Sequence, residues 1–304
     1  MAIKFVITLL LLCAAELSMA DDIEITLLGT GGPSPTIERF GPSTVIETQG
    51  QYFVFDAGRG TTIRLQQAGI PLDKIEHVFL THLHSDHITG LSDLWLSSWI
   101  WQRQNKMQLF GPPGTKDFAD HLQQAFTENI SLRTLNSGLN EQYSKLIVEE
   151  SAVDNIIVYQ KHDIKITAFH VNHGVVKHAY GYKFESHGRK IIISGDTAYS
   201  ENLIKHAKNA DILIHEIAAA SKALLDSNKR LTKIMAYHTD PDSLALVLNK
   251  TQAKHTILTH VLLFGISQKE VLTQLKNEFN RPLYFGKDLL KISIGESIVI
   301  TAEN

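Results

Sequence analysis

The chain has 304 residues, of which 43% are apolar and 20% are charged. This composition excludes an intrinsically disordered or collagen-like protein and allows a sizeable hydrophobic core. The formal net charge of -3 shows no basic excess, so nucleic acid is not the favoured partner, although a local basic groove is compatible with that balance.

The first twenty residues have the pattern of a secretory signal peptide. Lys4 precedes an apolar run that ends at Ala15, and Ser18-Met19-Ala20 offers small residues for cleavage near Ala20. The run is too short to span a bilayer. We therefore expect residues 1–20 to be removed and residues 21–304 to form one domain. That domain would be exported to the periplasm or the extracellular space, with no membrane segment in its mature form.

Cys13, the single cysteine, lies within the predicted signal peptide. The mature chain would therefore have no disulfide, and no zinc ion could be bound by sulfur.

Strand-like runs alternate with turns and helices along the rest of the chain. In the first half, strands are predicted at 23–28, 43–48, 52–56 and 75–81, helices at 61–68, 90–104 and 117–130, and a polar loop at 131–142. In the second half, helices are predicted at 241–249 and 268–279, and strands at 156–159, 164–171, 180–184, 190–194, 211–215, 256–259, 283–285 and 290–294. The two halves join near residues 130–150 without a linker-like run, which favours one domain.

The segment His82-Leu83-His84-Ser85-Asp86-His87 directly follows a predicted buried strand. In an extended conformation His82 and His84 point the same way, and a turn can aim the next two ligand-type side chains at a second point. Imidazole suits zinc and a carboxylate can complete a second site, so one loop can serve two ions. Further polar side chains follow the ends of later predicted strands: His173, Asp196, Glu216 and His260.

The His-x-His-x-Asp-His run resembles the signature of the metallo-β-lactamase superfamily, and later motifs match that family in order. The resemblance implies an α/β fold, an αββα sandwich of two mixed β-sheets flanked by helices, over residues 21–304. It implies two zinc ions with Asp196 between them. One ion would be bound by His82, His84 and His173, and the other by Asp86, His87 and His260.

Finer motifs resemble the branch that contains tRNase Z, zinc phosphodiesterases and exported arylsulfatase-like enzymes. These motifs are Leu27-Leu28-Gly29-Thr30-Gly31-Gly32-Pro33, Phe55-Asp56-Ala57-Gly58, Ala179-Tyr180-Gly181-Tyr182, and Glu216 followed 22 positions later by His238. The resemblance implies that His238 donates a proton to the leaving oxygen, oriented by Glu216, and that Asp86 belongs to the catalytic centre. We interpret Asp56 as a buried carboxylate that binds the backbone of the His-rich loop.

Two departures weigh against a tRNA substrate. The tRNase Z enzymes carry a tRNA-binding arm between the third His and the bridging Asp, but only 23 positions separate His173 from Asp196. The Arg-containing stretch that follows the final His in those enzymes is also absent after His260. The sequence therefore predicts an exported dizinc hydrolase that cleaves phosphodiester-type esters of small molecules.

Other interpretations stay open. Arylsulfatase and β-lactamase activities are alternatives within the enzyme class, and a metal-binding protein with a vestigial site is the non-enzyme alternative. A flavodiiron redox site is disfavoured because such sites use Glu at the position of His84. A homodimer is compatible with the resemblance. We interpret three tryptophans as packing residues, namely Trp95, Trp99 and Trp101. Six histidines are expected to be exposed or incidental: His77, His121, His162, His187, His206 and His255.

Overall fold

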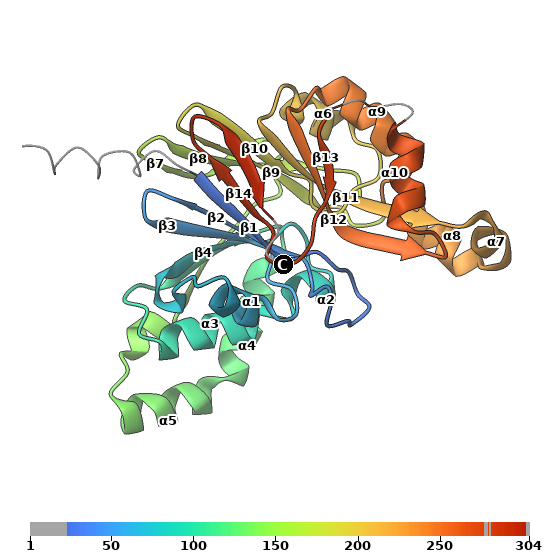
Figure 1. Ribbon diagram of the computed structural model, residues 1–304. Coiled ribbons are helices and arrows are strands. Elements are labelled where there is room, and N and C mark those ends of the chain that lie inside the picture. The colour runs from blue at the N-terminus through green and yellow to red at the C-terminus, as the bar shows by residue number, and fades with distance from the viewer. Residues whose placement is uncertain (1–22, 277–278, 280, 302–304) are drawn as a thin grey trace, which may run out of the picture.

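Two mixed β-sheets pack face to face, and helices cover the outer face of each sheet (Figure 1). The computed structural model describes residues 23–276, 279 and 281–301, so the predicted signal peptide lies outside the described residues. The four layers confirm the predicted αββα sandwich. None of the helices in the described part of the chain is long and apolar enough to cross a bilayer.

The first sheet has the strand order β15-β14-β1-β2-β3-β4-β5-β6 within the described residues. Its strands are β1 (Ile23–Gly29), β2 (Ser43–Thr48), β3 (Gln51–Phe55), β4 (Ile75–Phe79), β5 (Met107–Gly111), β6 (Leu146–Glu150), β14 (Lys291–Ile294) and β15 (Ile298–Thr301). The hairpin predicted between β2 and β3 is confirmed by their antiparallel pairing. Helices α1 (Thr61–Gln67), α3 (Leu91–Ile100), α4 (Thr115–Ala125) and α5 (Thr127–Ser137) lie on its outer side (Figure 1).

The second sheet has the strand order β13-β12-β11-β10-β9-β8-β7. Its strands are β7 (Ile156–Lys161), β8 (Ile164–His170), β9 (Tyr180–Ser186), β10 (Arg189–Ile193), β11 (Ile212–Ala220), β12 (His255–Phe264) and β13 (Leu283–Phe285). Its outer side is covered by α6 (Glu201–Ala207), α9 (Pro241–Thr251) and α10 (Gln268–Lys276). The chain crosses between the sheets after β6, slightly later than the sequence predicts.

Alternate strand residues from both sheets fill the space between them, as the period of two in the apolar pattern requires. Phe53 and Phe79 of the first sheet meet Tyr182 and Phe184 of the second in one buried cluster. Trp95 and Trp99 of α3 are buried in the core between that helix and the first sheet, as predicted. Trp101 is 65% exposed, so its assignment to the core is wrong: it lies at the C-terminal end of α3, beyond the covered face.

The polar loop predicted at 131–142 is wrong because α5 occupies most of that range. The helix predicted at 117–130 is two helices, α4 and α5, that meet at Phe126. Within α5 only Ile130 is buried, so the helix has no apolar stripe that a periodicity analysis could detect.

Two of the histidines predicted to be exposed or incidental are buried, because each ring stacks on an aromatic neighbour. His77 stacks on Phe53 with 5.2 Å between ring centroids, and His206 stacks on Phe169 at 4.2 Å. An imidazole ring can pack within an aromatic cluster. His77 lies on β4 and His206 on α6, and each position places the ring against its aromatic neighbour.

Candidate metal centre

The His-rich loop leaves the C-terminal end of β4 and brings its side chains together through a short helix, α2 (Ser85–Ile88). His82 Nε2 lies 2.9 Å from His84 Nδ1, and the same His84 nitrogen lies 3.2 Å from His173 Nε2. Ligand atoms of these three residues and of Asp196 all lie within 4.8 Å of one another. The structure thus groups the residues predicted to bind the first ion.

A second group adjoins the first. Ligand atoms of Asp86, His87 and His260 lie within 4.8 Å of one another. Asp196 Oδ2 lies 3.3 Å from both His87 Nε2 and His260 Nε2, and 3.8 Å from His82 Nε2 in the first group. A single carboxylate oxygen therefore faces both groups, which is the position predicted for a bridging ligand.

Local backbone features aim two of these side chains. Asp196 follows β10 through Gly195, whose φ is +60°; a Cβ there would lie 2.4 Å from the Tyr180 carbonyl oxygen, so glycine is required. His260 is the extra residue of a β-bulge: Glu216 pairs with Thr259 and Ile217 with Val261. The bulge turns His260 out of the β11–β12 ladder and toward the ligand cluster.

Asp56 supports the His-rich loop from behind, as predicted. Its Oδ1 accepts a 2.8 Å hydrogen bond from the Thr81 backbone N–H, and its Oδ2 accepts 2.8 Å bonds from Thr81 Oγ1 and His87 Nδ1. The bond to Nδ1 leaves Nε2 of His87 as the nitrogen that faces the other ligands. Such carboxylate–imidazole contacts orient metal-binding histidines.

Most of the pKa shifts in the cluster suit bound cations. His87 is the exception, because burial lowers its pKa but Asp196 and Asp56 raise it well above its ordinary value. Burial lowers the pKa of His173 to about 4, and burial together with the neighbouring His87 holds the pKa of His82 well below its ordinary value. Although burial opposes ionisation of Asp196, His260 and His87 hold the pKa of that carboxyl well below its usual range. Neutral imidazoles and ionised carboxylates are the forms that bind metal ions.

Buried ligand atoms that lack a hydrogen bond also indicate a metal site. His87 Nε2 and Asp196 Oδ1 are buried, and neither forms a hydrogen bond within the described residues. Buried polar atoms are normally satisfied, so such atoms at the centre of a donor cluster fit a bound ion. The cluster is a His/Asp metal-binding site consistent with two ions.

A buried pair, Glu216 and His238, lies beside the cluster. His238 Nδ1 donates a 2.9 Å hydrogen bond to Glu216 Oε1, which also accepts a 2.8 Å bond from the Thr197 backbone N–H. The His238 ring stacks near His260, with ring centroids 5.6 Å apart. Burial raises the pKa of Glu216; burial acts in the opposite direction on His238, but the Glu216 carboxylate raises the pKa of that imidazole.

The sequence analysis missed one contributor, Tyr237. Its backbone carbonyl accepts a 2.9 Å hydrogen bond from His173 Nδ1, and its ring lies 5.1 Å from the His173 ring. Only its position next to His238 could have indicated it. His170, His178 and His215 lie near the cluster in sequence, but none belongs to either ligand group.

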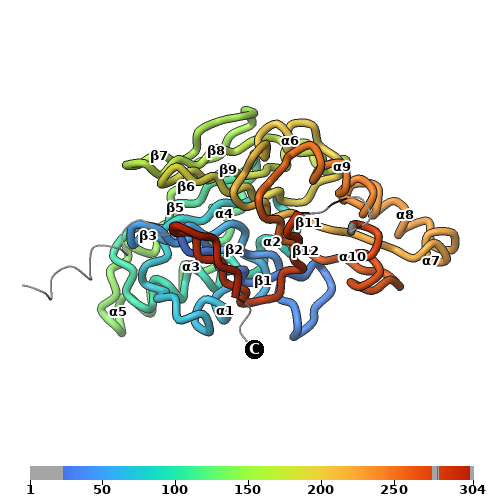
Figure 2. Tube along the Cα trace, turned by 45° about the horizontal axis from the view of Figure 1, so that its top comes forward, coloured from blue at the N-terminus to red at the C-terminus, as the bar shows by residue number. Residues whose placement is uncertain are grey.

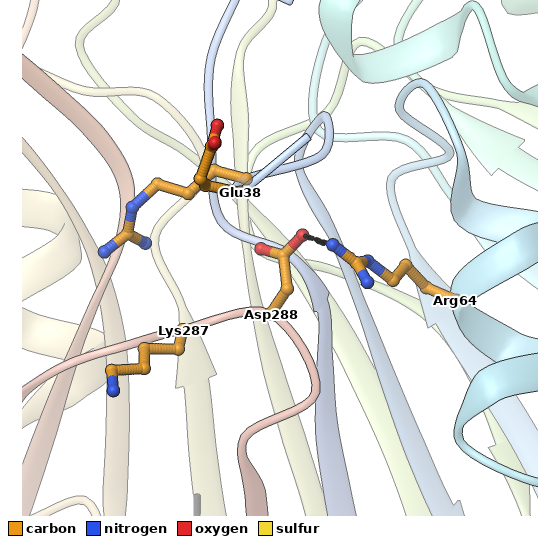
Figure 3. A pocket seen from close by; sticks show the side chains of 5 residues that line it. Glu38, Arg64, Lys287 and Asp288 are labelled. Atoms are coloured by element: carbon orange, nitrogen blue, oxygen red, sulfur yellow. Dashed lines mark hydrogen bonds and ion pairs between the residues drawn. The ribbon is translucent and has the colours of Figure 1, made fainter. Parts of the chain in front are cut away.

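A separate cavity of about 310 Å³ is lined by Glu38, Arg39, Arg64, Lys287 and Asp288 (Figure 3). Asp288 at its wall accepts hydrogen bonds from the Thr30 N–H and hydroxyl, and it pairs with Arg64 at 3.0 Å. Because the Val261 N–H donates to the Thr30 carbonyl, this network fixes the turn at residues 29–32 against the strand that carries His260. The cavity is lined by none of the predicted ligands.

Comparisons with known proteins agree with this site and fold. Residues 23–260 match the family model described as "Anti-Pycsar protein Apyc1". The ribonuclease Z of Mycobacterium bovis strain BCG is 30% identical over 277 residues, covering 90% of this chain and 98% of that protein.

Two solved structures share the fold. The metallo-β-lactamase-fold protein YhfI of Bacillus subtilis has a TM-score of 0.68 at 17% identity and covers 90% of this chain and 100% of its own. The short form of human tRNase Z has a TM-score of 0.67 at 23% identity, with coverages of 88% and 98%. The chain therefore belongs to the Anti-Pycsar protein Apyc1 family, has the metallo-β-lactamase fold, and is a relative of ribonuclease Z.

Proposed function

We propose that this chain is a dizinc phosphodiesterase in which His238 donates a proton to the leaving oxygen. The observation that carries the proposal is the Glu216–His238 hydrogen bond of 2.9 Å directly beside the metal-binding cluster. A metal cluster alone is compatible with several reactions, whereas a buried carboxylate–imidazole pair at its edge suits an ester with a basic leaving group.

The residues fit two zinc ions by their chemistry. His82, His84 and His173 would bind one ion, Asp86, His87 and His260 the other, and Asp196 would contact both. Nitrogen and carboxylate oxygen are ligands that zinc accepts, and two bound ions activate water and stabilise charge on a phosphoryl group.

The proton donor is prepared by its neighbours. Because Nδ1 of His238 is bonded to Glu216, Nε2 is the nitrogen that carries the transferable proton. The carboxylate raises the pKa of His238 against the effect of burial, which favours the protonated ring near neutral pH. A ring nitrogen of His238 lies within 4.8 Å of ligand atoms of Asp196 and His260, close enough to reach a phosphoryl group bound there.

The relatives support a phosphodiester, and the fold argues for a substrate other than folded tRNA. The M. bovis protein and the human structure bear the names ribonuclease Z and tRNase Z. In this chain β9 and β10 occupy most of the interval between His173 and Asp196, so that interval has no segment for a protruding arm. We propose an unstructured or small phosphodiester as the substrate.

Location is a second part of the proposal. The pattern of residues 1–20 supports export, with cleavage near Ala20. Sequencing the N-terminus of the protein recovered from the extracellular or periplasmic fraction tests it, and recovery of an uncleaved chain in the cytosol would contradict it.

The test of function is a hydrolysis panel on the zinc-loaded protein with bis-p-nitrophenyl phosphate, p-nitrophenyl sulfate and a chromogenic β-lactam. We expect phosphodiester hydrolysis to dominate and the Asp86→Ala variant to be inactive. Preferred hydrolysis of the sulfate or the lactam would replace the phosphodiesterase assignment. Inertness toward all three substrates with two bound zinc ions would favour the vestigial metal-binding protein.

A further inference from the structure

The connection between β13 and β14 carries Asp288, a carboxylate that the sequence analysis did not single out. This connection crosses from the second sheet to the first. In Figures 1 and 2 the last strands of the first sheet, in red, lie beside β1, in blue, with which β14 pairs. Asp288 therefore lies next to the turn that follows β1, and its side chain is only 4% exposed.

Asp288 binds two segments at once, residues 30–32 and residues 39–41. Its Oδ1 accepts hydrogen bonds from the N–H and the hydroxyl of Thr30, at 2.9 and 2.8 Å. Its Oδ2 accepts a 2.7 Å bond from the Phe40 N–H and a 3.2 Å bond from Arg64 Nε. A 2.8 Å bond from the backbone N–H of residue 31 to the Phe40 carbonyl joins the two segments directly. The carboxylate thus fixes both segments relative to each other.

The first segment, residues 30–32, lies against His260. The Thr30 carbonyl accepts a 2.9 Å hydrogen bond from the N–H of Val261, the residue that directly follows His260 in the β-bulge. A Cβ added at Gly32 would lie 3.6 Å from His260 Nε2, so the backbone of this segment packs close to the imidazole. A displacement of the segment would therefore displace His260.

The second segment, residues 39–41, lies against Asp86. A Cβ added at Gly41 would lie 2.9 Å from the Asp86 carbonyl oxygen, and a Cβ added at Gly58 would lie 2.5 Å from the same oxygen. The Asp86 backbone is therefore in close contact with two glycines, one of which is in the segment that Asp288 binds. Asp288 thus supports two of the three residues assigned to the second ion.

Other contacts support the first ligand group. His82 Nδ1 lies 3.0 Å from Thr81 Oγ1, and His173 Nδ1 donates a 2.9 Å hydrogen bond to the Tyr237 carbonyl. Within the described part of the chain, no hydrogen bond or ion pair joins Asp288 or its two segments to a ligand of this group. The two ligand groups therefore have separate supports.

We propose that Asp288 is a positioning residue for the second ion, which is assigned to Asp86, His87 and His260, and that it has no such role for the first ion. The inference rests on the part of the proposed function that gives the cluster two ions. Asp288 acts through the backbone, because it belongs to neither ligand group. Contacts of this supporting kind change metal affinity by about 10- to 100-fold.

Titration of the metal-free protein with zinc, in competition with a chromogenic chelator, tests the proposal in the wild type and in Asp288→Asn. Asparagine keeps the size of the side chain, but its amide would place an N–H donor opposite the Phe40 N–H and Arg64. We expect one ion to bind with wild-type affinity and the other about 10- to 100-fold more weakly. Unchanged affinities, or equal losses for both ions, would overturn the proposal.

Asp211→Asn is the matched control for a general loss of stability. Asp211 is also a buried carboxylate that accepts a backbone N–H and pairs with cations. It directly precedes β11, whereas the metal cluster lies beyond the other ends of these strands. Both variants should lower the urea midpoint of unfolding, but Asp211→Asn should keep both zinc affinities. A selective loss of one ion in this control as well would show that zinc affinity follows global stability and would overturn the positioning role.

Thr30→Val is a milder variant that keeps the proposal testable if Asp288→Asn does not fold. It removes the hydroxyl that donates to Asp288 and keeps the backbone N–H contact. The same ion should be weakened, by a smaller factor than in Asp288→Asn. Wild-type affinities for both ions in Thr30→Val, together with an unfolded Asp288→Asn, would overturn the proposal.

A double-mutant cycle identifies which ion depends on Asp288. His260→Ala removes a ligand of the second group, so this variant should bind one ion, and adding Asp288→Asn should cause no further loss of affinity. A further loss in the double variant would show that Asp288 also supports the first ion. Loss of both ions from His260→Ala alone would show that the two groups do not bind separately. Either result would overturn the selective role.

The positioning role and the proposed function can fail separately, because zinc binding is measured without a substrate. A selective loss of one ion in Asp288→Asn would support the positioning role even if the wild type hydrolyses none of the three esters. Hydrolysis of bis-p-nitrophenyl phosphate by an Asp288→Asn protein that binds both ions with wild-type affinity would support the phosphodiesterase and overturn the positioning role.

Discussion

The Nδ1–H of His173 donates a 2.9 Å hydrogen bond to the backbone carbonyl of Tyr237, and this bond joins a predicted metal ligand to the segment that carries His238. The bond fixes the imidazole tautomer and leaves Nε2 free for a metal ion. Because Tyr237 immediately precedes His238, the positions of the metal ligand and the proton donor depend on each other.

Gly174→Ala should disturb this link. Gly174 has a φ of +59°, and an added Cβ would lie 2.9 Å from Tyr237 Cβ. We expect metal affinity to fall by about 10- to 100-fold, the usual effect of losing such a supporting contact, with the fold retained. Competition with a chromogenic zinc chelator measures the affinity.

Gly188→Ala is the matched control. Its φ of +68° imposes a similar backbone strain, but nothing lies within 4 Å of the added Cβ. Equal metal affinities for the two variants would show that the Tyr237 contact does not position His173.

Asp196→Ala should remove bound metal as well as activity. Its Oδ2 faces both ligand groups, at 3.3 Å from His260 Nε2 and 3.8 Å from His82 Nε2. Elemental analysis of the purified variant should therefore find less than the two ions expected for the wild type. Full zinc content in the variant would refute the bridging assignment.

His238→Ala should slow hydrolysis while zinc content stays unchanged. General acid catalysis contributes about 10²- to 10⁴-fold, and the contribution is largest for esters with poor leaving groups. We expect a large loss on an alkyl phosphodiester and a small loss on a p-nitrophenyl ester. An unchanged rate on the alkyl ester would exclude His238 as the proton donor.

Asp211→Asn should destabilise the protein away from the site. Burial raises the pKa of Asp211, but a 2.7 Å bond from Lys254 and a 2.8 Å bond from the Lys190 N–H lower it overall. A carboxyl whose pKa is lowered by folding stabilises the fold above its unfolded-state pKa, and that stabilisation disappears as the pH falls through the folded-state pKa.

The variant should therefore lose about 1–2 kcal/mol of unfolding free energy at neutral pH, since Lys254 is exposed and screened by solvent. The difference from the wild type should shrink under strongly acidic conditions. Urea denaturation in the presence of a chelator measures both values without a contribution from metal release. Exposed Asp226→Asn is the control, and a difference that persists at low pH would contradict the explanation.

The local signals in the sequence were sufficient for most strands, whereas the fold class followed from the resemblance of the ligand motifs to the metallo-β-lactamase superfamily. The order of His82 to His260 along the chain identified residues that the structure brings together, although their individual roles remain predictions. Strands with buried apolar runs, such as β10, are visible because every second residue faces the core between the sheets.

Features that depend on distant pairing could not be predicted. The strand predicted to end at Thr259 continues to Phe264, because pairing with the end of β11 holds it extended past the bulge. Helix α8 (Lys229–Met235) was missed because Leu231 is its only buried residue. The hydrogen bond from His173 to the Tyr237 carbonyl could not be predicted either, because any residue at position 237 would supply the same backbone oxygen.

The bulge at His260 has a consequence for how this chemistry is attached to the protein. Pairing between β11 and β12 is regular on both sides of the extra residue. Glu216 pairs with Thr259 before it, and Ile217 pairs with Val261 after it. Deletion of His260 alone would leave a continuous parallel ladder between β11 and β12, and β12 would then contribute no ligand to the cluster. A whole ligand can thus be gained or lost by one insertion or deletion that spares the sheet, so inheritance of the fold and inheritance of the metal centre are separable.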